Sequence, residues 1–140
     1  MTLPQFKFEK LAVWHQSLDV IDACYRLAEL LPRTEDFNLK SQMRRAATSI
    51  ALNIAEGSTS QSNAEQARFV GMAIRSLVEV VACLRIIARR GWEIAPDALS
   101  GADAQAQTLF ARLTAFRRAL TTSPAGVAED GIEYGAAGIP

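Results

Sequence analysis

The stretch from Phe69 to Ala88 constrains the fold most, because 15 of its 20 residues are apolar and they surround a helix on all sides. Just before it, Ser62 and Glu65 have the spacing of a capping box, which starts a helix. Gly91 is placed to end the helix in the left-handed conformation. We therefore expect a helix over residues 62–90 that neighbouring elements cover on several sides.

One stripe of this helix is expected to face the core of its own subunit: Val70, Ala73, Leu77, Val80, Leu84 and Ile87. A second apolar face, formed by Ile74, Val78 and Val81, predicts packing against another subunit, although a central helix in a monomer has the same pattern. A membrane span is the third reading. It is disfavoured, because two arginines and one glutamate fall within the apolar stretch.

Three more segments have helical periodicity, over about residues 8–31, 38–56 and 98–122. Pro32 is expected to end the first, Asn38 to cap the second, and Gly57 to stop the second in the left-handed conformation. No segment has the alternation of an exposed strand. The pattern predicts an all-α, antiparallel up-down-up-down four-helix bundle over residues 1–122, which is oligomeric, and a flexible tail over 123–140.

The charge and the cysteines bear on the cellular compartment of the chain, but they do not identify its binding partner. Basic and acidic residues balance at 15 each, but three acids fall after residue 122, so residues 1–122 carry a net charge of +3. Cys24 and Cys83 each lie in an apolar helical pattern and are interpreted as small buried hydrophobic residues. The N-terminus lacks the features of a secretory signal, which favours a cytoplasmic protein.

The residues give no sign of catalysis. His15 is the sole histidine and has no carboxylate or cysteine partner in the sequence, so we interpret it as a surface or boundary residue. The Glu-x-x-His motif of di-metal bundles, phosphate-binding glycine loops and nucleophile elbows are all missing from the sequence. The chain is therefore predicted to be no enzyme, and neither a metal nor a cofactor is expected.

Arginine outnumbers lysine twelve to three, which points to either of two roles. Planar guanidinium groups suit phosphate contacts, and they also suit salt bridges between subunits. The candidate nucleic-acid-binding residues are Arg44, Arg45, Arg68, Arg112, Arg117 and Arg118. A ring of subunits would repeat each arginine and make a weak basic patch continuous.

A polar stripe runs along the second predicted helix at steps of three and four residues. Its members are Gln42, Arg45, Ser49, Asn53 and Glu56. The stripe is interpreted either as a solvated face or as a subunit seam or polar network, in which Asn53 and Glu56 bind backbone or arginine groups.

Three segments, FEKLAVWHQSLDVIDACYRLAELLP, LKSQMRRAATSIALNIAEGS and SNAEQARFVGMAIRSLVEVVACLRIIARRGW, resemble the four-helix bundle proteins encoded in intervening sequences of bacterial 23S ribosomal RNA genes. The resemblance covers about residues 6–94, and SQMRRAATSIALNIAEG is its most specific part. Ala51 and Leu52 stand where the family usually has proline and serine, so a proline kink is not expected here.

The same family includes, by resemblance, the accessory variability determinant proteins of diversity-generating retroelements, which form pentameric barrels and bind nucleic acid and a reverse transcriptase. The resemblance implies a homopentamer and places Arg44 and Arg45 at the family's paired-arginine position. The leading hypothesis is a ring that binds RNA or DNA. The alternative is a scaffold that binds a partner protein and no nucleic acid.

Overall fold

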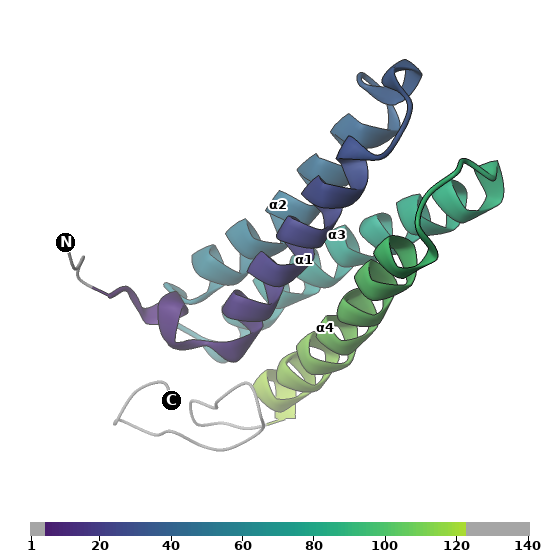
Figure 1. The fold of residues 1–140 in the computed structure, drawn as a ribbon. Coiled ribbons are helices and arrows are strands. Elements are labelled where there is room, and N and C mark those ends of the chain that lie inside the picture. The colour runs from purple at the N-terminus through teal and green to yellow at the C-terminus, as the bar shows by residue number, and fades with distance from the viewer. Residues whose placement is uncertain (1–4, 123–140) are drawn as a thin grey trace.

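The computed structural model describes residues 5–122, so the tail predicted over 123–140 lies outside the described residues. Four long helices lie side by side in the described part (Figure 1): α1 (Ala12–Glu29), α2 (Leu39–Gly57), α3 (Asn63–Arg90) and α4 (Pro96–Thr122). Two short 3-10 helices, η1 (Lys7–Lys10) and η2 (Arg33–Glu35), precede α1 and α2. Residues 5–122 contain no strand.

The four helices enclose one apolar core. α1 packs against α2 and α4, and α3 packs against the same two helices, so α1 and α3 lie across the bundle from each other. The core stripe predicted for α3 is buried along its whole length, from Val70 to Ile87. Each fully buried leucine or isoleucine in such a core stabilises the fold by roughly 1.5–3 kcal/mol relative to an exposed one.

The ends of α3 follow the expected chemistry. The Ser62 hydroxyl accepts a hydrogen bond from the backbone N–H of Glu65 at 3.1 Å, which satisfies one of the free donors at the helix start. Gly91 has a φ of 73° and ends the helix in the left-handed region.

The two end signals of α2 differ in part from the prediction. Gly57 is the last residue of α2 and is not left-handed, since Gly91 is the one described glycine with positive φ. A β-carbon at Gly57 would stand 2.8 Å from the β-carbon of Phe69, so glycine is needed there for the close approach of α2 and α3. Asn38 holds the N-cap position of α2 as predicted, but its side chain makes no capping hydrogen bond, because its amide oxygen accepts from Gln42 and its amide nitrogen donates to Glu35.

The first and last helices begin at different residues from those predicted. The helix expected from residue 8 begins at Ala12, because Lys7–Lys10 form a 3-10 turn and Leu11 is extended. The helix expected from residue 98 begins at Pro96, where the fixed φ of proline suits a first helical turn.

Candidate functional site

A groove of about 540 Å³ lies between α3 and α4. Its lining residues are Ile74, Phe110, Thr114, Arg117, Arg118 and Thr121. The α4 residues at 110, 114, 117 and 121 recur at steps of four, three and four, so they form one stripe on the side of α4 that faces α3. This groove is the candidate functional site.

The side chain of Arg117 on α4 reaches α3 at Gly71. A β-carbon on Gly71 of α3 would stand 3.3 Å from Nε of Arg117 and 3.5 Å from its Cζ. Glycine in the middle of a helix costs about 1 kcal/mol relative to alanine. The open space at Gly71 lets the guanidinium of Arg117 lie close to the backbone of α3.

The groove combines groups that suit a nucleic-acid strand. Arg117 and Arg118 are both exposed, and neither has an ion-pair partner within residues 5–122. Phe110 keeps 39% of its surface exposed beside them. Guanidinium groups bind phosphates, and an exposed aromatic ring offers a face on which a base can stack.

The other candidate arginines lie outside this lining. Arg44 of α2 lies over the ring of Tyr25 on α1, with Cζ 5.7 Å from the ring centroid, while Arg45 is exposed on another side of α2. Arg68 lies over its neighbour Phe69 at 5.1 Å. Arg112 is exposed on α4 but five residues before Arg117, which places it roughly 140° away around the helix. Of the six candidates, Arg117 and Arg118 line the groove together.

The polar stripe of α2 differs along its length. Gln42, Arg45 and Glu56 are exposed, whereas Ser49 and Asn53 are half-buried. Ser76 of α3 donates a hydrogen bond to the Ser49 hydroxyl at 2.9 Å. The amide nitrogen of Asn53 donates to the backbone carbonyl and the hydroxyl of Ser49 at 2.9 and 3.1 Å. The middle of the stripe thus forms a polar network between two helices of the same chain.

The three residues predicted for the subunit interface differ in exposure. Ile74 and Val81 are partly buried and pack against the core of their own chain. Val78 lies between them in the sequence and keeps 51% of its surface exposed. Val78 is therefore the member of this set that is most available to a second subunit.

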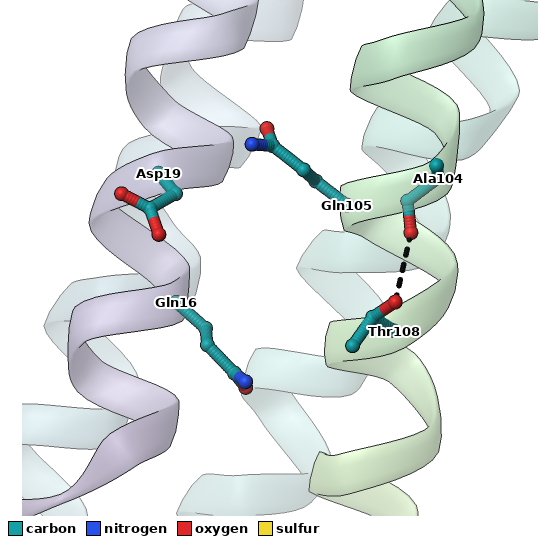
Figure 2. Close-up of a pocket in the computed structure, with 5 residues that line it drawn as sticks. All are labelled: Gln16, Asp19, Ala104, Gln105 and Thr108. Carbon is teal, nitrogen blue, oxygen red and sulfur yellow. Dashed lines mark hydrogen bonds between the residues drawn. The ribbon is translucent and has the colours of Figure 1, made fainter.

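A smaller cavity, of about 270 Å³, lies between α1 and α4 (Figure 2). Gln16 and Asp19 of α1 and Gln105 of α4 are among its lining residues, and the side chains of Gln16 and Gln105 extend into the gap between the two helices. Oε1 of Gln16 is buried without a hydrogen-bond partner in the described part of the chain. Such an unpaired atom costs stability unless water or a ligand reaches it.

The most reactive side chains in residues 5–122 are those of His15, Cys24 and Cys83. Nε2 of His15 lies 2.7 Å from the backbone oxygen of Glu9, on the surface. Cys24 and Cys83 are free and buried, and burial raises the pKa of Cys24 to about 12. Between residues 5 and 122, no three metal-binding side chains gather at one place. None of the helices in that range has the length and apolarity needed to cross a bilayer.

The sequence did not identify Gly71, Phe110, Thr114 or Thr121 as parts of a site. The helical periodicity of α4 places Phe110, Thr114 and Thr121 on one face of that helix. Which helix packs against this face depends on tertiary packing, which periodicity does not predict. A glycine inside a predicted helix, such as Gly71, gave no signal by itself. The signal that existed was the spacing of Phe110, Thr114 and Arg117 on one stripe of α4.

Comparison with known proteins identifies a family and solved structures of similar fold. The model of the 23S rRNA-intervening sequence protein family matches residues 9–115. A crystal structure of a protein of unknown function from the S23 ribosomal protein family of Bacteroides thetaiotaomicron VPI-5482 is similar, with a TM-score of 0.66 and 22% identity. The match covers 73% of this chain and 94% of that one, and it supports the fold. No curated protein matches the chain.

Proposed function

The chain belongs to the 23S rRNA-intervening sequence protein family, and we propose that it is a non-catalytic, homo-oligomeric helical bundle that binds single-stranded RNA or DNA in the groove between α3 and α4. The observation that carries this proposal is the pair Arg117 and Arg118, exposed and without an acidic partner in residues 5–122, beside the exposed ring of Phe110. Two cations and a stacking surface in one groove match the needs of a flexible strand.

The proposed bundle is antiparallel, up-down-up-down, because short connections join successive helices. Its proposed oligomer is a pentamer, as the resemblance to accessory variability determinant proteins implies. A ring would bring several copies of the Arg117–Arg118 pair to one strand and raise its affinity through multivalency. The proposed compartment is the cytoplasm, where buried free thiols such as Cys24 and Cys83 stay reduced.

The test is a titration of fluorescent single-stranded RNA and DNA with the full chain, at several salt concentrations. The test variant is Arg117→Gln/Arg118→Gln, and the matched control is Arg26→Gln/Arg33→Gln, which removes the same charge from exposed positions elsewhere. We expect the test variant to bind several-fold more weakly. Its plot of log affinity against log salt should be shallower, by about 0.7 for each lost phosphate contact.

Two results count against this function. If both variants bind as the unchanged chain does, the groove is not the binding surface. If the unchanged chain binds no RNA and no DNA at low salt, the nucleic-acid proposal fails, and the alternative of a scaffold for a partner protein takes its place.

A further inference from the structure

The outer face of α1 combines exposed apolar and acidic side chains. Leu18, Asp22, Tyr25 and Glu29 recur at steps of four, three and four, so they form one stripe, which we call the α1 outer face. Leu18 and Tyr25 keep 36% and 45% of their surface exposed. Within residues 5–122, neither Asp22 nor Glu29 has an ion-pair partner.

The outer face of α3 has the opposite charge. Arg75, Val78, Ala82, Ile86 and Arg89 are all exposed and follow one another at steps of three and four, and we call them the α3 outer face. Val78 and Ile86 keep 51% and 49% of their surface exposed. The acidic residue between them, Glu79, is also exposed and lines one groove with Ala82 and Ile86, so this side of α3 has a net positive charge from Arg75 and Arg89.

Neither face suits a second copy of itself. Two α3 outer faces would bring Arg75 and Arg89 against the same arginines, and two α1 outer faces would bring Asp22 and Glu29 together. Like charges in contact cost several kcal/mol in a protein interface. An α1 outer face against an α3 outer face pairs apolar residues with apolar residues and acids with arginines.

We infer that the subunit interface of this protein joins the α1 outer face of one copy to the α3 outer face of the next. The inference rests on the proposed homo-oligomer and names the two surfaces that build it. The occupant of each face is a second copy of this chain, because the chain itself has the complementary charge and exposed apolar side chains that each face needs.

The spacing of the side chains fits this pairing. Leu18 and Tyr25 are seven residues apart and Val78 and Ile86 are eight apart, so each apolar pair spans about 10–12 Å along its helix. Glu29 lies one turn beyond Tyr25. When the two helices run in opposite directions, Glu29 lies near Arg75, and when they run in the same direction it lies near Arg89.

The positions of the two faces predict the type of assembly. α1 and α3 lie on opposite sides of the four-helix arrangement, so one chain can use both faces at once (Figure 1). An interface between two different faces joins the copies head to tail. It produces a closed ring when the rotation from each copy to the next adds up to a full turn. A twofold dimer would need one face that is complementary to itself, which neither face is.

The test is light scattering of four versions of the full chain. Asp22→Arg/Glu29→Arg reverses the acidic face, and Arg75→Glu/Arg89→Glu reverses the basic face. Glu56→Arg/Glu93→Arg is the matched control, because it reverses two exposed acids that lie outside both faces. Circular dichroism checks that all versions keep their helices.

Each face variant is expected to fall to the mass of one chain, whereas the control keeps the mass of the unchanged chain. An equimolar mixture of the two face variants is expected to form assemblies heavier than one chain, because each contact between unlike variants again joins opposite charges. A ring of five cannot alternate the two variants throughout, so the mixture is not expected to regain the full mass of a pentamer. If the unchanged chain is oligomeric and both face variants keep its mass, the interface is elsewhere and the proposed oligomer stands. If the unchanged chain is a monomer, the interface and the proposed oligomer both fail.

Discussion

The guanidinium of Arg117 on α4 lies against α3 at Gly71, where a β-carbon would stand 3.3 Å from Nε and 3.5 Å from Cζ. The two residues are far apart in the sequence, and the bundle brings them together at the groove that Arg117 and Arg118 line. Gly71 thus has a helical φ and a packing role, in contrast to Gly91, which is left-handed.

The first prediction is that Gly71→Ala stabilises the fold but weakens RNA binding. Alanine should raise the free energy of unfolding by up to about 1 kcal/mol, because glycine is a poor helix residue. The new methyl group should also move the guanidinium of Arg117 by a few tenths of an ångström or more and weaken RNA binding. Urea unfolding and RNA titration measure the two effects.

The matched control for this variant is Gly101→Ala on α4, where nothing lies within 4 Å of the added β-carbon. Gly101→Ala should stabilise the chain by a similar amount and leave RNA binding unchanged. Equal RNA affinity for the two variants would contradict the role assigned to Gly71.

The second prediction concerns Gly57, at the end of α2. Gly57→Ala should lower the free energy of unfolding by about 1–3 kcal/mol, because its β-carbon would meet Phe69 at 2.8 Å and the two helices would have to move apart. Thermal or urea unfolding measures the change. Gly101→Ala again supplies the comparison, and a Gly57→Ala chain as stable as the Gly101→Ala chain would show that α2 and α3 do not approach as closely as described.

The third prediction concerns Cys24 and pH. Burial, and to a lesser extent the charge of Cys83, raise the pKa of Cys24 from 9.0 to about 12. The unfolded chain therefore loses the Cys24 proton first as pH rises, so this contribution to stability is complete below pH 9 and is lost between about pH 9 and 12. At pH 10 the loss should be about 1.4 kcal/mol.

The measurement is the free energy of unfolding against pH for the unchanged chain and for Cys24→Ala. The alanine variant is less stable at neutral pH because it leaves a small cavity, but its stability should fall less steeply above pH 9. Parallel curves for the two chains above pH 9 would mean that the Cys24 thiol is not buried in the folded state.

The sequence predicted the long helices and the core stripe of α3 because both depend on local periodicity. The wrong predictions came from residues that serve more than one purpose. Gly57 had the position of a left-handed stop, but its structural purpose is the close approach of Phe69. Asn38 had the position of a cap, but its side chain bonds to Gln42 and Glu35.

The candidate site was predicted only in part, for the same reason. Arginine content pointed to six residues, yet Arg44 and Arg45 are neighbours in the sequence and point to different sides of α2. Arg117 and Arg118 became a site because Phe110 and Ile74 lie beside them, and this depends on how α3 and α4 pack. Periodicity within one helix does not carry that information.

Sedimentation velocity of the full chain mixed with labelled single-stranded RNA tests the central claim most directly, because it reports the mass of the protein and the RNA bound to it together. We predict one protein species with five times the mass of a single chain, which carries the RNA at about 50 mM salt and releases most of it at about 200 mM. A protein that sediments as a single chain, or an oligomer that leaves the RNA free at the lower salt concentration, would contradict the account.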